Sequence, residues 1–135
     1  MSEPASSDFP RRNLLRTRPS PGQRLDYVIT LGCDLALASH SGVTLKMRYI
    51  PDRLILDQTA IADYVQAIEK SDWAGLEELA QSLLDDISNE LVPRWLEISL
   101  RQATSAVDYA VTMEDRQPGW ANPQLLGRIR PWEHV

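Results

Sequence analysis

Cys33 and His40 are the two side chains whose chemistry could act directly on a bound molecule. Cys33 is the only cysteine of the 135-residue chain, and a thiol becomes a nucleophile when it loses its proton. The negative charge of the neighbouring Asp34 would raise the pKa of this thiol. Alternatively, Cys33 is a small apolar residue buried in a strand. His40 is a weaker candidate. Histidine titrates near neutral pH, which suits proton transfer, but His40 could instead be a turn residue with no chemical role.

The composition indicates one soluble globular domain. Hydrophobic residues make up 43% and charged residues 24% of the chain, which excludes a disordered or collagen-like protein. One cysteine cannot form an internal disulfide, and with two histidines it supplies too few ligands for a zinc finger. Neither a run of ~20 apolar residues nor a hydrophobic secretory signal is present. We therefore expect a cytoplasmic protein.

Charge is distributed unevenly around the net value of −5. Residues 1–24 hold five arginines and two acids, whereas residues 51–92 hold ten acids and two basic residues. A basic arm can contact nucleic acid or phosphate, but the acidic remainder favours a solvated tail beside an acidic helical face. Nucleic acid is therefore not an expected partner.

Proline positions predict the domain limits. Seven of the nine prolines lie near the two ends, and only Pro51 and Pro93 lie between. Because proline removes a backbone donor, the ends should be mostly irregular or draped on the surface. We expect a flexible basic N-terminal arm over residues 1–22, one domain over 23–116, and an extension with proline and tryptophan over 117–135.

Inside the domain the hydrophobic period changes twice. Residues 25–35 and 43–50 have strand composition or strict alternation, and 95–101 and 107–114 alternate again. Between these pairs, apolar residues recur at helical spacing in two segments. The first is capped by Asp57 or Thr59, and the second starts at residues 71–72 and ends before Pro93.

The element order ββααββ predicts an α+β fold. Strands on either side of a helix pair indicate an antiparallel four-stranded sheet with two helices on one face. Such a sheet has two edges, and proteins charge, cover or pair their edges. We expect pairing through sheet edges, and hence a homo-oligomer.

Four short strings support a more specific interpretation, and they lie in one order along residues 25–101. They are Ile29-Thr30-Leu31-Gly32-Cys33, Tyr49-Ile50-Pro51-Asp52, Leu83-Leu84-Asp85-Asp86 and Val92-Pro93-Arg94-Trp95-Leu96-Glu97. In order and spacing they resemble the tunnelling fold, and within it the single-module NADPH-dependent nitrile reductases that reduce 7-cyano-7-deazaguanine in queuosine biosynthesis.

The resemblance implies a site for a purine- or pterin-like ring at a subunit interface. Cys33 stands where the cysteine of that family adds to the nitrile carbon. Glu77 takes the place of the glutamate that anchors the base, with Glu78 as the register alternative. One carboxylate can accept hydrogen bonds from a ring N–H and an adjacent amino group. An acid favoured by the helix dipole is the alternative for Glu77.

The sequence differs from the family at the residues that transfer protons and bind the cofactor. Leu76 occupies the position of the catalytic histidine, and the aspartate that follows the family's cysteine is absent, with His40 or Ser41 nearest in register. In the cofactor motif the acid remains as Asp57, a further substrate-binding candidate, but both lysines are missing. Because a dianionic phosphate needs basic partners, the resemblance implies NADPH while the residues argue against it.

Three interpretations of function stay open. The chain is either a divergent ring-binding enzyme that uses Cys33, or a non-catalytic oligomeric binding or scaffold module that has lost the NADPH-dependent chemistry. Metal-dependent hydrolysis, as in the related GTP cyclohydrolases, would use Cys33 and His40 as ligands. Catalytic zinc normally has three protein ligands, and His134 is the only other histidine, so no metal is expected.

Overall fold

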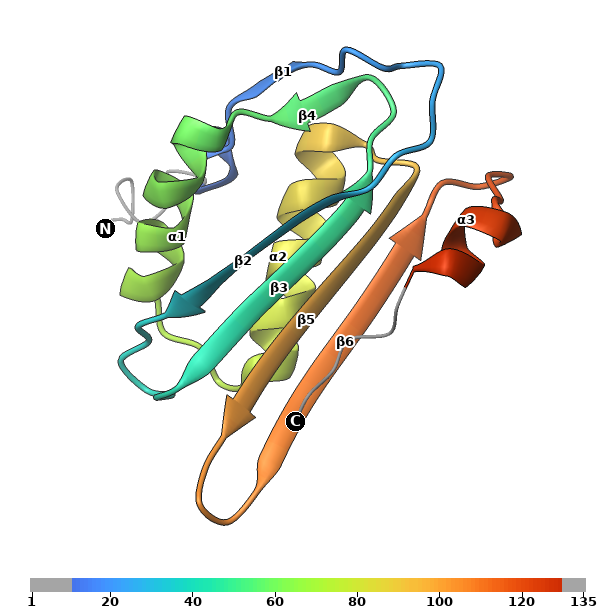
Figure 1. Ribbon diagram of the computed structural model, residues 1–135. Coiled ribbons are helices and arrows are strands. Elements are labelled where there is room, and N and C mark those ends of the chain that lie inside the picture. Colours follow the sequence, from blue (N-terminus) through green and yellow to red (C-terminus); the bar gives the residue numbers. More distant parts are fainter. Residues whose placement is uncertain (1–10, 130–135) are drawn as a thin grey trace.

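A computed structural model describes residues 11–129, which form a four-stranded antiparallel sheet with two helices across one face (Figure 1). The strand order in this sheet is β2-β3-β5-β6, so β2 and β6 are its edges. Its strands and helices are β2 (Ile29–Leu35), β3 (Val43–Ile50), α1 (Ile61–Lys70), α2 (Leu76–Leu91), β5 (Trp95–Ala103) and β6 (Asp108–Arg116). The expected α+β class and ββααββ order are confirmed.

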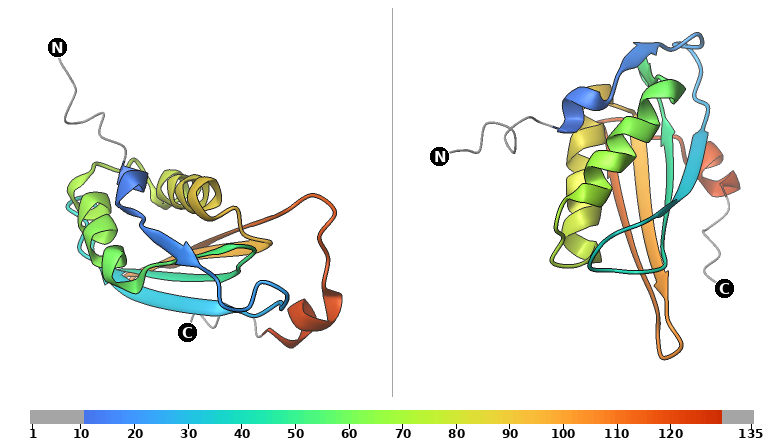
Figure 2. Two further views of the ribbon diagram at one scale, coloured as in Figure 1. Left: turned by 90° about the horizontal axis from the view of Figure 1, so that it is seen from above. Right: turned by 90° about the vertical axis from the view of Figure 1, so that its left-hand side faces the viewer.

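The core lies between the sheet and the helix pair, which Figure 2 shows on the same side. Alternate residues of β3 and β5 point to this side, and the apolar stripe of α2 covers them. The stripe consists of Leu76, Leu79, Ala80, Leu83, Ile87 and Leu91, all buried. Each large side chain of this kind contributes about 1.5–3 kcal/mol when fully buried. The alternation that predicted these strands therefore also fixes which face the helices cover.

The described part of the expected N-terminal arm contains regular structure. Residues 11–14 form a short 3₁₀ helix, η1 (Arg11–Leu14), and β1 (Thr17–Pro19) pairs antiparallel with β4 (Leu54–Leu56) in a second, two-stranded sheet. Leu15 is 4% exposed and belongs to the core. This segment is more ordered than proline content predicted, because its apolar side chains bury themselves against the helices. The boundary at residue 22 stays a prediction.

Charged groups hold this segment against the helices. The Arg11 Nε atom lies 2.8 Å from Oδ2 of Asp86, and the Arg11 guanidinium lies 5.3 Å from the ring centre of Trp73. The Tyr64 hydroxyl donates a hydrogen bond of 2.7 Å to the same Asp86 oxygen. Asp86 on α2 therefore joins η1 to α1 through one carboxylate.

Strand β2 begins at Ile29, opposite Tyr49, because β3 ends one residue further on, at Ile50. The residues before β2 are held by Arg94 and not by a neighbouring strand. Its guanidinium donates to the backbone oxygens of Gln23 and Leu25 at 2.7 and 2.9 Å, and to Asp26 Oδ1 at 2.9 Å. The strand composition of residues 25–28 therefore does not become a strand.

Helix α2 begins at Leu76, later than the sequence predicted. Ser71 ends α1 instead: its backbone N–H donates to Ile68 O, and its hydroxyl donates to Ala67 O at 3.0 Å. The Trp73 indole N–H also donates to Ile68 O, at 2.9 Å. These bonds satisfy the last carbonyls of α1 and make residues 71–75 the connection between the two helices.

The C-terminal extension lies beside the end of β6 and is tied to the domain by side-chain amides. Its helix, α3 (Pro123–Arg128), is capped by Asn122, whose side-chain oxygen accepts from Leu125 N at 3.0 Å. The Asn122 amide nitrogen donates to Asp26 at 2.9 Å, and the Gln117 amide donates to Asp52 at 3.0 Å. The extension is anchored at the end of the sheet away from the β5–β6 hairpin (Figure 1).

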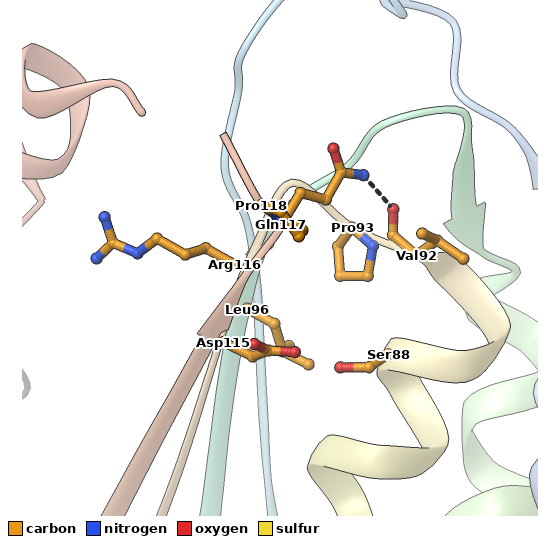
Figure 3. A pocket seen from close by; sticks show the side chains of 8 residues that line it. All are labelled: Ser88, Val92, Pro93, Leu96, Asp115, Arg116, Gln117 and Pro118. Atoms are coloured by element: carbon orange, nitrogen blue, oxygen red, sulfur yellow. Dashed lines mark hydrogen bonds between the residues drawn. The ribbon is translucent and has the colours of Figure 1, made fainter. Parts of the chain in front are cut away.

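Val92 ends α2 in a left-handed backbone conformation. Its φ is 45° and its ψ is 57°, and among residues 11–129 it is the only non-glycine residue with a positive φ. Figure 3 shows the surrounding pocket of about 150 Å³, in which the Gln117 amide donates to Val92 O at 2.9 Å. The side chain itself is 58% exposed, so it gains little from burial. A left-handed conformation costs a residue with a Cβ roughly 1–2 kcal/mol.

Replacing Val92 should therefore stabilise the fold. We expect Val92→Asn to raise the free energy of unfolding by about 1 kcal/mol, because asparagine tolerates this conformation and the lost contacts are few. Urea denaturation measures the change. Val107→Asn is the control, because Val107 is also exposed but has no positive φ. A gain at Val107 equal to that at Val92 would contradict the strain argument.

Candidate functional site

A pocket of about 380 Å³ opens at the end of the sheet where α2 begins. Three segments that are distant in the sequence meet there: the β2–β3 loop, the first turn of α2, and the β5–β6 hairpin with the adjoining strand ends. Its lining residues are His40, Gly75, Leu76, Glu77, Gln102, Thr104, Val107 and Tyr109. Two of the residues chosen from the sequence, His40 and Glu77, therefore lie in one pocket.

Glu77 presents an exposed carboxylate on the wall of this pocket. The Tyr109 hydroxyl on β6 donates a short hydrogen bond to its Oε2 atom. This bond, with a further one to the backbone N–H of Glu77, holds the pKa of the carboxyl below its usual value. The same bond raises the pKa of Tyr109. Glu77 is thus an anionic acceptor at neutral pH, in the first turn of a helix where the dipole also favours it.

His40 is held in the pocket by the loop that carries it. The Ser39 hydroxyl and His40 Nδ1 are 2.8 Å apart, and the same hydroxyl lies 3.5 Å from Trp73 O in the α1–α2 connection. The Gln102 amide donates to Ser41 O at 2.7 Å, which fastens the loop to β5. The other ring nitrogen, Nε2, can donate or accept a hydrogen bond, depending on the tautomer.

Cys33 lies on edge strand β2, paired with Leu45 of β3, and packs against the core on the helix-covered face. Burial raises the pKa of its thiol, and the carboxylates of Glu69 and Asp34 raise it further. The effect expected of Asp34 is therefore present, with Glu69 as an additional cause. Cys33 is not among the residues that line the Glu77 pocket.

The other two candidates, Asp57 and Glu78, are not among the residues that line the Glu77 pocket. Asp57 precedes α1 and caps η2 (Gln58–Ala60), accepting from the Thr59 N–H at 3.1 Å and the Thr59 hydroxyl at 2.9 Å. These two bonds lower the pKa of Asp57. The ten residues of α1, about 15 Å long, separate Asp57 from the end that holds Glu77. Glu78 is exposed beside Glu77 but is not a lining residue.

Tyr109 and Gln102 are pocket residues that sequence reasoning did not assign to the site. Tyr109 belongs to the alternating stretch of residues 107–114, and the residue is 46% exposed. The two residues are register partners on β5 and β6, which places them side by side at the end of the sheet. No local sequence motif identifies them. They lie near Glu77 only because the β5–β6 hairpin packs beside the first turn of α2.

Metal and membrane features can be stated for residues 11–129. In this range no group of three or more His, Cys, Asp or Glu side chains is placed to hold a metal ion. His134, which the metal interpretation would need, lies outside the described residues. Within the same range no helix is long and apolar enough to cross a membrane.

No family model matches the sequence. Among curated proteins, the chain is similar to the NADPH-dependent 7-cyano-7-deazaguanine reductases of two strains of Acidithiobacillus ferrooxidans, each 28% identical over 82 residues. The match covers 60% of this chain and 57% of each reductase, so the chain spans little more than half the length of these relatives.

Among solved structures, the chain is similar to the archaeosine synthase QueF-like protein in its apo form. The TM-score is 0.52 at 16% sequence identity, covering 65% of this chain and 90% of that one. A putative dihydroneopterin aldolase from Vibrio cholerae gives a TM-score of 0.47 at 16% identity, over 69% of this chain and 99% of that one. At this identity the first likeness shows the fold alone.

The raised pKa of Cys33 predicts that its thiol reacts slowly with alkylating reagents. At pH 7 we expect iodoacetamide to alkylate Cys33 several-fold more slowly than it alkylates the same residue in the urea-unfolded chain, because only the thiolate reacts. Glu69→Gln should speed the reaction by removing a negative charge near the sulfur. Mass spectrometry measures both rates. Alkylation in the folded protein as fast as in the unfolded chain would contradict this environment.

Proposed function

We propose that this divergent protein of the tunnelling fold binds a purine- or pterin-like ring in the Glu77 pocket, at an interface between two copies of the chain. The observation that carries the proposal is the anionic Glu77 carboxylate in a pocket that also holds His40 and Tyr109. A carboxylate can accept two parallel hydrogen bonds from a ring N–H and the adjacent amino group. The volume of the pocket, about 380 Å³, lies in the range of small-molecule sites.

The proposed site needs two copies of the chain because Cys33 and Glu77 lie far apart within one copy. Cys33 is on β2 and the partner of Glu77 is on β6, at opposite edges of the four-stranded sheet. Pairing the edge of one copy with that of the next would satisfy both edges and bring Cys33 of one copy toward the Glu77 pocket of the other. The pocket lies at the end of the sheet and is open to solvent in a single copy, so a neighbouring copy could cover a ring bound there.

The candidate chemistry in such a shared site is addition of a thiolate to a nitrile. The Cys33 sulfur would bond to the nitrile carbon, and the nitrile nitrogen would take up a proton to give a thioimide. His40 is the proton source proposed for this step, because Leu76 stands at the position of the family's histidine. The NADPH named for the curated relatives would supply hydride for the reduction that follows. The missing lysines leave its phosphate without its usual partners, so we do not extend the proposal to reduction.

A second candidate function is ring binding without chemistry. The observation that favours it is the environment of Cys33, where burial and two carboxylates raise the thiol pKa and so oppose thiolate formation. In that case the chain is an oligomeric binding or scaffold module that keeps the fold and the anchor. Both candidates share the Glu77 pocket and differ only in whether Cys33 reacts.

Ring binding is tested by titration calorimetry with guanine, pterin and 7-cyano-7-deazaguanine. We expect at least one of them to bind, and Glu77→Gln to weaken the affinity by roughly tenfold or more, because an amide accepts only one of the two hydrogen bonds. Glu78→Gln is the matched control, since it removes the same charge from the neighbouring residue. Equal losses in both variants, or the absence of binding at millimolar ligand, would refute the anchor.

The reaction is tested separately by intact-mass spectrometry after mixing with 7-cyano-7-deazaguanine. A catalytic site gives an adduct of the added mass of the nitrile, which Cys33→Ala abolishes and His40→Ala slows. Binding without an adduct at any pH from about 6 to about 10.5 would support the binding module, because burial and two carboxylates raise the pKa of Cys33 above the ordinary thiol value and the window must extend beyond it. Light scattering of the same samples reports whether the chain is an oligomer.

A further inference from the structure

The hydrogen bond between Tyr109 and Glu77 joins the edge of the sheet to the first turn of α2. We infer that Tyr109 is a positioning residue for the ligand: its hydroxyl holds the Glu77 carboxylate in the orientation that accepts the ring edge. This inference rests on the proposed function and adds to it a residue that neither the family strings nor the comparisons assign.

The atoms of the carboxylate leave room for both partners. Tyr109 donates to Oε2, whereas Oε1 is directed toward the loop, 3.1 Å from where a Cβ at Gly75 would lie. A carboxylate offers about four lone-pair positions on its two oxygens. The bonds from Tyr109 and from the backbone N–H of Glu77 therefore leave two of these positions for two N–H donors. Tyr109 can stay bonded while a ring N–H and an amino group bind.

Tyr109 is itself held at a fixed place. It pairs with Gln102 in the β5–β6 ladder, two residues from the hairpin. That hairpin is closed by Thr104, whose backbone N–H and hydroxyl both donate to Val107 O, at 2.8 and 3.0 Å. An exposed glutamate on a helix has several rotamers, and fixing one before the ligand arrives removes an entropic cost from binding. The strand supplies this restraint.

The hydrogen bond from Tyr109 should also change the pH dependence of ligand binding. The charged or titratable groups near the pair are Glu78 on α2 and His40 on the β2–β3 loop, while Asp108 on β6 is bonded to Arg101 of β5 at 2.8 and 2.9 Å. Donation from Tyr109 lowers the pKa of Glu77. Because the ligand needs the carboxylate, binding is present above this pKa and lost as the pH falls through it. Without the hydroxyl the loss moves to higher pH.

The experiment compares wild type with Tyr109→Phe, and Tyr27→Phe is the matched control. Tyr27 also loses a hydroxyl hydrogen bond, of 2.6 Å to Ser20, but it lies outside the pocket. We expect Tyr109→Phe to weaken guanine binding by roughly three- to tenfold and to move the acid midpoint of binding to higher pH. Tyr27→Phe should change neither. An unchanged midpoint and affinity in Tyr109→Phe overturns the inference.

A second measurement separates this inference from the proposed function. NMR titration of ¹³C-labelled glutamate, with Glu77 assigned through Glu77→Gln, follows the carboxyl without any ligand. We expect its midpoint to rise in Tyr109→Phe and to stay unchanged in Tyr27→Phe. A rise together with no binding of guanine, pterin or 7-cyano-7-deazaguanine in wild type refutes the proposed function and leaves the contact established. Guanine binding that is lost in Glu77→Gln but unaffected by Tyr109→Phe refutes the inference alone.

Discussion

The packing of α2 across the sheet is the constraint on which the rest of the structure depends. Its apolar stripe is buried along its whole length against alternate residues of β5, among them Leu96, Ile98 and Leu100. A helix held at so many points cannot slide or rotate without exposing apolar surface, at about 25 cal/mol for each Å². Its first turn is therefore fixed at one end of the sheet, and Glu77 is fixed with it. The pocket forms because the β2–β3 loop and the β5–β6 hairpin end at the same place.

Much of this architecture could be predicted from the sequence, and the parts that could not share one cause. Alternation in residues 43–50 and 95–101 gave the inner strands, and helical spacing gave both helices, since burial on one face leaves a period in the sequence. The starts of β2 and α2 were placed too early because distant partners decide them: Arg94 binds the carbonyls before Ile29, and Trp73 binds the end of α1. Of the site, Glu77 and His40 came from a resemblance and from residue chemistry, but Tyr109 reaches them only through the hairpin register.

The separation of Cys33 from Glu77 changes what the single cysteine means. In composition it indicated a reducing compartment, and in the resemblance it indicated a nucleophile. In the structure it packs on the core side of an edge strand, where Glu69 and Asp34 oppose its ionisation. A second copy at that edge could alter this environment by supplying a positive or hydrogen-bonding group, since a thiol pKa falls beside such groups. In the proposed function, reaction at Cys33 would therefore depend on a second copy, whereas Glu77 and the Tyr109 hydroxyl bonded to it lie within one chain.

The chemical character of the pocket narrows the kind of ligand that fits it. Its eight lining residues include neither lysine nor arginine, and the one acidic residue among them is Glu77. A phosphate would meet a carboxylate there with no cation to offset the repulsion, whereas a neutral ring with an N–H and amino edge would meet an acceptor. For the same reason we expect the pocket to favour a free base over its nucleotide. In the proposed function, ring binding would therefore depend on Glu77 and not on basic residues.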